Sequence, residues 1–215
     1  MATARGTSPA LLILMLILTG ASCRSGMGGQ SPVVQPGAPG QESRTITPAQ
    51  SAAAPRHNAA DIKFMQGMIH HHAQALDMTA LLATRTNRED MKKLALRIEL
   101  SQEDEITMMR EWLASRGADV PGEHAHHAPG APLMPGMLTD EHMARLAAAK
   151  GVEFDRLFLE YMIKHHEGAL VMVKELFSTS GAGQEAEIFA FASDVDADQL
   201  IEIRRMGVML KELQK

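Results

Sequence analysis

Two pairs of adjacent histidines are the residues in this sequence best suited to chemistry, because methionines surround each pair at helical spacing. Met68 precedes His71 and His72 by about one turn, Met78 follows them, and the same spacing recurs at the second pair. Neutral imidazole is a ligand for copper, zinc, nickel and iron, whereas the thioether of methionine favours the soft ion Cu(I). The expected metal ligands are Met68, His71, His72, Met78, Met162, His165, His166 and Met172.

The two histidine pairs belong to an internal repeat. Residues 61–78 align with residues 155–172 at a shift of 94 positions, and residues 95–113 align with residues 192–210 at a shift of 97. Such self-similarity indicates that one structural unit occurs twice in the chain. The sequence leaves open whether the two copies make two similar metal sites or one shared site.

Acidic residues at repeated positions are candidates to orient the imidazole rings. A histidine that binds a metal through one ring nitrogen usually donates its other N–H group to a carboxylate or carbonyl. We expect Glu105 and Glu202 to accept hydrogen bonds from these N–H groups, because they lie on the apolar face of the second helix in each copy, which faces the histidines. The full accessory set in the two copies is Asp61, Glu105, Met109, Asp155, Glu202 and Met206.

The elements that position these residues are predicted to be helices. Apolar residues recur at intervals of three and four, which predicts helices over 59–84, 88–115, 153–177 and 184–215. Asn87 and the Glu89-Asp90 pair suit the start of the second helix. A shorter helix over 139–150 is expected to stop at Gly151. Two hairpins with one apolar stripe per helix predict an all-α, antiparallel four-helix bundle over 57–215, with hairpins at 57–116 and 139–215.

The N-terminal segment has the pattern of an export signal. One basic residue, Arg5, precedes nine apolar residues at 10–18, a run too short for a permanent membrane helix. Gly20-Ala21-Ser22-Cys23 resembles the lipobox of bacterial lipoproteins, which implies a signal peptide over 1–22 and a lipid anchor on Cys23. The alternative is an ordinary cleaved signal with a cysteine nearby. Both predict an exported protein of the periplasm or cell envelope, and the first predicts a membrane-anchored one.

Two segments have too few large apolar side chains to fold by themselves. Residues 23–56 are rich in Gly, Pro, Ser and Gln, which predicts a flexible tether. Residues 117–138 form a His- and Met-rich linker between the hairpins. Its histidines are either a low-affinity capture site for metal ions or part of a solvated hinge. The linker candidates are His124, His126 and His127, followed by Met134 and Met137.

Composition excludes several classes of function. A net charge of -5 without a clustered basic face argues against nucleic-acid binding. One cysteine excludes a disulfide framework and an all-cysteine zinc site. A di-iron oxidase of the four-helix type needs Glu-x-x-His on two helices, whereas the Glu-x-x-His of this chain, Glu123 to His126, lies in the linker. No complete catalytic constellation is visible, and the sequence identifies no protein partner.

The repeated motifs resemble a known family. The pattern F-x-x-x-M-I-x-H-H-x-x-A-L-x-M at 64–78 and 158–172, with Q-x-x-E-I-x-x-M at 102–109 and 199–206, is similar to the CopM-like family, a bacterial domain of unknown function with a ferritin-like fold. The resemblance covers residue 59 to the C-terminus. It implies a ferritin-like four-helix bundle that is exported, binds copper and takes part in copper tolerance.

The expected function is therefore non-enzymatic binding of copper for buffering, trafficking or tolerance in the envelope. Cu(I) is the favoured ion because of the thioethers, with Cu(II) or zinc as the other candidates. Two alternatives remain: a structural envelope lipoprotein without a metal role, in which the histidines are pH-sensitive core groups, and a di-iron oxidase.

Overall fold

The structure is a computed structural model that describes residues 33–35, 43–46, 56–122 and 133–213. The predicted signal peptide, Cys23 and the linker residues His124, His126 and His127 lie outside the described residues. The chain divides after Ala53 into two units, and each unit is described by itself. The described helices are α2 (Ala59–Ala80), α3 (Leu82–Arg85), α4 (Glu89–Ser115), α5 (Asp140–Ala148), α6 (Gly151–Ser178) and α7 (Ala186–Glu212).

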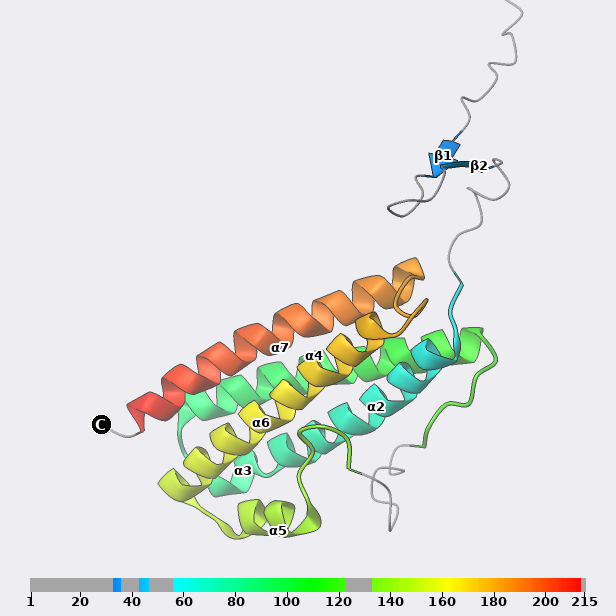
Figure 1. Cartoon of the computed structure of the whole chain (residues 1–215). Helices are drawn as coiled ribbons and strands as arrows, with labels where there is room; N and C mark the ends of the chain where they lie inside the picture. Colours follow the sequence, from blue (N-terminus) through cyan, green and yellow to red (C-terminus); the bar gives the residue numbers. More distant parts are fainter. Residues whose placement is uncertain (1–32, 36–42, 47–55, 123–132, 214–215) are drawn as a thin grey trace, which may run out of the picture. The chain divides into compact units, whose positions relative to one another are not determined.

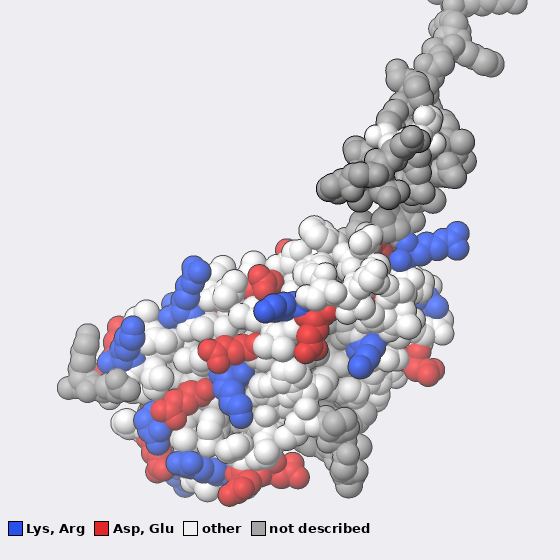
Figure 2. Space-filling view, in the orientation of Figure 1, with Lys and Arg blue, Asp and Glu red and all other residues white. Residues whose placement is uncertain are grey.

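The second unit is an all-α bundle, as the periodicity predicts. Helices α2 and α4 form the first hairpin, α6 and α7 form the second, and α2 packs along α6 (Figure 1). The short α5 packs against α6. No helix in the described ranges is long and apolar enough to cross a membrane. On the face shown in Figure 2, basic and acidic side chains are interspersed along the bundle.

Several element boundaries differ from the prediction. The first helix ends at Ala80, and a separate single turn, α3, follows it. Arg88, not Asn87, is the N-cap of α4, although Glu89 and Asp90 lie in the first turn as expected. Gly151 does not stop the short helix, which already ends at Ala148; with φ +60 it is instead the first residue of α6.

The predicted flexible tether contains a short strand pair. Strands β1 (Val33–Gln35) and β2 (Arg44–Ile46) pair in antiparallel register, with Val33 opposite Ile46 and Val34 opposite Thr45. Val33, Val34, Thr45 and Ile46 are β-branched residues, which favour the extended backbone of such strands.

The bundle core consists of two apolar clusters separated by a buried polar layer. One cluster contains Met78, Leu94, Phe158 and Met206, and the other contains Met68, Met109, Val173 and Ile188. Every long helix contributes to both clusters, and its polar residues lie between the two contributions. The buried members of this polar layer are His71, His72, Gln102, Glu105, His165, His166, Gln199 and Glu202.

Asp61 fastens the start of α2 and does not orient a histidine. Its Oδ2 accepts a hydrogen bond from the Asn58 N–H at 2.8 Å, while the Asn58 side chain caps the first turn in return. Its Oδ1 accepts from the Gly183 N–H at 2.7 Å, in the turn between α6 and α7. Both carboxylate oxygens are therefore occupied, about 15 Å along the helix from His71, which corrects the predicted role of Asp61.

Asp155 lies at the equivalent position of the second hairpin and is also far from the histidines. Burial raises the pKa of Asp155, and a hydrogen bond with Thr86 opposes the rise. Thr86 follows α3, in the turn that leads to α4. Each repeated aspartate thus contacts the turn of the other hairpin, so the repeat joins the two copies at both ends of the bundle.

We expect Asp61→Ala to lower the free energy of unfolding by about 2–4 kcal/mol, because it removes an N-terminal cap and leaves the buried Gly183 N–H unpaired. Urea denaturation followed by circular dichroism measures this loss. Asp119→Ala, which removes an exposed carboxylate, is the matched control and should change stability by less than about 0.5 kcal/mol. A similarly small effect of Asp61→Ala would show that Asp61 does not fasten the turn.

Candidate metal centre

The four repeated histidines meet in one row across the bundle. Helix α2 carries His71 and His72, α6 carries His165 and His166, and all four are 0% exposed. The ring centroids of His71 and His165 are 3.8 Å apart, and the centroids within each adjacent pair are 6.2 Å apart. The two copies therefore share one layer, because antiparallel α2 and α6 cross with equivalent residues facing each other.

Glutamates hold the two outer rings of the row. His72 Nε2 lies 2.5 Å from Glu105 Oε2, and His166 Nε2 lies 2.7 Å from Glu202 Oε2. These are the two contacts predicted from the repeat. A carboxylate in this position accepts a hydrogen bond from the Nε2–H group and fixes both the tautomer and the orientation of the ring. The lone pair of the neutral ring is then on Nδ1.

The inner rings also have ring nitrogens available for a ligand. His71 Nε2 donates to the Pro135 carbonyl at 3.0 Å, which again leaves the lone pair on Nδ1. Within the described part of the chain, Nδ1 of all four histidines and Nε2 of His165 have no hydrogen-bond partner. A buried polar atom without a partner is costly to leave unmatched. This donor set fits a metal ion that imidazole can bind.

Burial keeps the inner rings neutral. It lowers the pKa of His71 to about 3, with His72 adding to the effect. Burial, followed by the neighbouring His71, lowers the pKa of His165 well below its usual value. The neutral form is the one that binds a metal, so both rings are in their ligand form at neutral pH.

The predicted methionine ligands lie on both sides of the histidine layer. Met68 and Met172 belong to one apolar cluster, together with Met109. Met78 and Met162 belong to the other, together with Met206. The antiparallel repeat therefore places two of the four thioether candidates above the histidines and two below them.

The row is not a closed cage. In the described ranges, no three His, Cys, Asp or Glu side chains form a group that could hold a metal ion. The His71 and His165 ring centroids are 3.8 Å apart, and the ring planes are tilted by 38°. Imidazole binds a metal ion in the plane of its ring, at about 2.0 Å from the nitrogen, so an ion at this layer would lie at the edges of the two rings, with the flanking thioethers as the remaining soft ligands.

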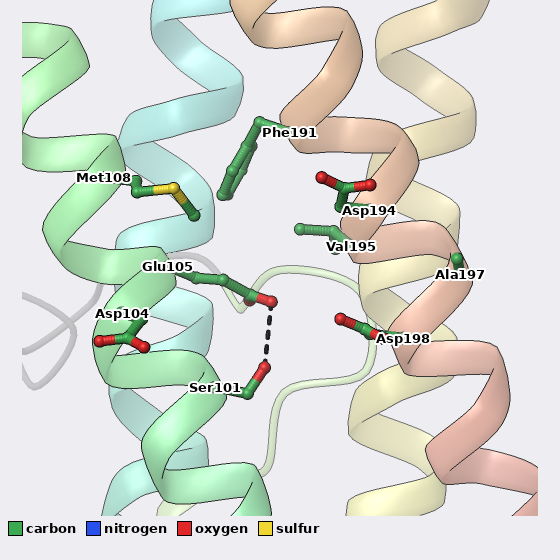
Figure 3. Close-up of a pocket in the computed structure, with 9 residues that line it drawn as sticks. All are labelled: Ser101, Asp104, Glu105, Met108, Phe191, Asp194, Val195, Ala197 and Asp198. Atoms are coloured by element: carbon green, nitrogen blue, oxygen red, sulfur yellow. Dashed lines mark hydrogen bonds between the residues drawn. The ribbon is translucent and has the colours of Figure 1, made fainter.

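A cleft between α4 and α7 reaches the outer end of the row at Glu105. It has a volume of about 280 Å³, and Figure 3 shows Glu105 and Asp198 on its opposite walls. The Ser101 hydroxyl donates to Glu105 Oε1 at 3.3 Å. Burial raises the pKa of Asp198, and the nearby Glu105 and Glu202 add to the rise. The Glu105–His72 pair is thus adjacent to an acidic, solvent-open surface.

Sequence reasoning missed the segment that covers the inner histidines. Residues 133–138, which we call the strap, lie at the end of the predicted linker. Gln74 of α2 binds the strap twice: its Nε2 donates to the Leu138 carbonyl at 2.9 Å, and its Oε1 accepts from the Leu138 N–H at 2.7 Å. Met137 is 6% exposed. This part of the predicted linker is therefore docked on the bundle and not a solvated hinge.

One signal in the sequence could have located the strap. Gly168 lies in the middle of α6, where glycine costs about 1 kcal/mol relative to alanine. A glycine inside a strong helix pattern indicates a close approach of another backbone. Its partner is the Pro135-Gly136 peptide of the strap.

The family of the chain follows from a match that spans both hairpins. The model of a family described as "Domain of unknown function (DUF305)" matches residues 61–210. The chain belongs to the DUF305 family. The DUF305 match includes the four histidines, their glutamate partners and the strap. No curated protein matches the chain with significance.

Solved DUF305 structures share this fold. A candidate secreted DUF305 protein from Streptomyces coelicolor is 30% identical, with 72% of this chain and 94% of that chain covered and a TM-score of 0.62. A DUF305 fragment from Deinococcus radiodurans is also 30% identical, with coverage of 74% and 99% and a TM-score of 0.62. CopM in its Cu(II)-bound form is 28% identical, with coverage of 71% and 96% and a TM-score of 0.58. CopM structures with Cu(I) and with silver are similar at a TM-score of 0.55.

Proposed function

We propose that this DUF305 protein binds copper in the cell envelope and buffers it, passes it on or confers tolerance to it. The observation that carries this proposal is the buried row of four imidazoles, whose Nδ1 atoms lack partners in the described structure and whose outer rings are held by Glu105 and Glu202. Packing alone does not reward four buried imidazoles. The structures of CopM with Cu(I), Cu(II) and silver support the proposal.

We further propose that Cu(I) is the preferred ion. The donors of the bundle are imidazole and thioether, and the methionines above and below the row are the softest of them. The proposed ligands are Nδ1 of His71 and His165 at the centre, with His72 and His166 beside them. The thioether candidates are Met68, Met78, Met162 and Met172.

The proposed location is the periplasm or cell surface, with a lipid anchor on Cys23. The signal-like N-terminus supports export, and the candidate secreted relative from Streptomyces coelicolor agrees with it. In an oxidising compartment, thiolates are lost to disulfides and oxidation, so a copper site built from imidazole and thioether is the more durable choice. Copper ions and the membrane are the proposed partners.

A competition titration of the purified protein with Cu(I), Cu(II), Zn(II) and Fe(II) tests this function. We expect tight Cu(I) binding that persists when His124, His126 and His127 are all replaced by alanine, because the buried row supplies the ligands. The dissociation constant for Cu(I) should change by less than about threefold in that variant. Loss of Cu(I) binding in it would instead make the linker the site.

Two other outcomes of the titration would overturn the proposal. Absence of binding for every ion would favour a structural lipoprotein in which the histidines are core groups. Oxygen consumption by the iron-loaded protein would favour a di-iron oxidase.

A further inference from the structure

The strap lies directly on the inner histidines. The Pro135 carbonyl accepts the Nε2–H of His71, and Gln74, one turn further along α2, holds Leu138 through both of its amide atoms. Gln74 is 6% exposed. Two hydrogen bonds from one buried amide fix the position of the strap relative to α2.

Two glycines bring the strap backbone against α6. Gly136 has φ +79, a conformation that favours glycine. A Cβ atom added at Gly136 would lie 2.6 Å from the Lys164 carbonyl oxygen, and one added at Gly168 would lie 2.0 Å from the Pro135 carbonyl oxygen. The Pro135-Gly136 peptide therefore fits between α2 and α6 only because Gly136 and Gly168 both lack a side chain. This contact is three residues from His165.

The same docking places a further thioether beside the histidine row. A Cβ atom added at Gly67 would lie 3.2 Å from Met134 Sδ and 3.4 Å from Met172 Cε. Gly67 precedes His71 by one turn on the same face of α2, so the Met134 and Met172 side chains meet one helical turn from His71. His71 Nδ1 is fully buried and has no hydrogen-bond partner among the described residues.

We propose that the strap is part of the copper site: it supplies the Met134 thioether as a ligand beside Met172 and His71, and Gln74 is the residue that positions it. This inference rests on the proposed function and extends it. Thioethers bind Cu(I) and other soft monovalent ions in preference to harder ions. A ligand carried by a docked segment also shields the site from water. The strap therefore determines the selectivity of the site for soft ions and also limits the access of water to it.

Met134→Leu tests the ligand, with Met91→Leu, a buried methionine of α4 outside the proposed site, as the control. Both changes replace a thioether by a hydrocarbon of similar volume. We expect Met134→Leu to raise the dissociation constant for Cu(I) by at least about tenfold and to remove one sulfur from the copper environment seen by X-ray absorption spectroscopy. Affinity for Zn(II) and the results for Met91→Leu should stay within about twofold of wild type. An unchanged sulfur count in Met134→Leu would overturn the inference.

Gln74→Leu tests the positioning role. It removes both hydrogen bonds to Leu138 without touching a proposed ligand. We expect it to weaken Cu(I) binding by a factor similar to that of Met134→Leu, and we expect the double variant to be no weaker than either single variant, because both changes remove the same thioether. Losses that multiply in the double variant would show that Gln74 acts independently of Met134.

The outcomes separate this inference from the function on which it rests. If the wild-type protein binds no Cu(I), the proposed function fails. If the wild-type protein binds Cu(I) and the histidine variants lose it, while Met134→Leu keeps full affinity and its sulfur count, only the role of the strap is refuted.

Discussion

Replacing the two inner histidines by His71→Gln and His165→Leu in one protein is expected to weaken Cu(I) binding by at least about 100-fold. The reason is that the two rings at the centre of the row have centroids only 3.8 Å apart, and both carry a ring nitrogen without a hydrogen-bond partner in the described structure. The substitutions remove both imidazoles while preserving the size of the buried side chains. Competition with a Cu(I) chelator measures the change.

The same variant should fold normally, which makes the loss of binding interpretable. Glutamine at position 71 keeps an N–H donor for the Pro135 carbonyl, which His71 now satisfies. Leucine at position 165 replaces a buried ring that lacks hydrogen bonds within the described residues. The free energy of unfolding should therefore be at least that of wild type, and up to about 3 kcal/mol higher. His57→Gln, at the edge of Trp112 and outside the row, is the control. Cu(I) affinity within threefold of wild type in the double variant would refute the central site.

Acidification is expected to destabilise the bundle, and the inner histidines set the pH window. In the native state the pKa of His71 is about 3, whereas an unfolded histidine has its ordinary value of 6.5. Between these values the unfolded chain binds a proton that the native state does not, so stability is lost as the pH falls below 6.5. Each pH unit costs about 1.4 kcal/mol for such a group, or about 3 kcal/mol from pH 6.5 to pH 4.5. His165 acts in the same direction.

Two aspartates partly offset the loss of stability that the histidines cause as the pH falls. The pKa values of Asp155 and Asp198 are raised by burial, so these groups favour the native state as the pH falls. Urea unfolding at pH 7.0, 5.5 and 4.5 separates the two effects when wild type is compared with the His71→Gln, His165→Leu variant. We expect the free energy of unfolding to fall more steeply with decreasing pH in wild type than in the variant. The difference in slope should correspond to the uptake of about one to two additional protons on unfolding. Identical slopes would show that the inner histidines do not stay neutral in the fold. Because the native pKa of His71 is about 3, protons should not displace copper from the proposed site of the folded protein over this pH range.

Much of the bundle could be predicted because the information is local and repeated. Apolar spacing of three and four residues places His71 and His72 on the buried face of their helix whatever it packs against. Glu105 and Glu202 recur at matched positions in the two copies, which made them recognisable as acceptors for the outer imidazoles. The boundaries of the helices were less predictable, since the starts of α4 after Arg88 and of α6 after Lys150 depend on backbone conformations that neighbouring turns impose.

One prediction failed, and one alternative was excluded, for reasons of tertiary structure. Asp61 is polar and repeated, like the glutamates, yet its partner is the Gly183 N–H, a residue 122 positions away. Of the two alternatives for the linker, the solvated hinge does not describe residues 133–138, because Gln74 and Gly168 dock that segment. Gly168 signals a close backbone approach within its helix, but the sequence does not say that Pro135 and Gly136 are the segment that approaches it.

The amino-acid sequence by itself determined the helices, the buried stripe of histidines and methionines, and the donor chemistry of those side chains, because these follow from local periodicity and side-chain type. Only the tertiary structure decided that the two copies share one row, with His71 against His165, and that the strap covers it. The physical reason is that α2, α6 and the strap meet through complementary surfaces far apart in the chain. Contacts of that kind depend on how whole helices pack, which no local pattern specifies.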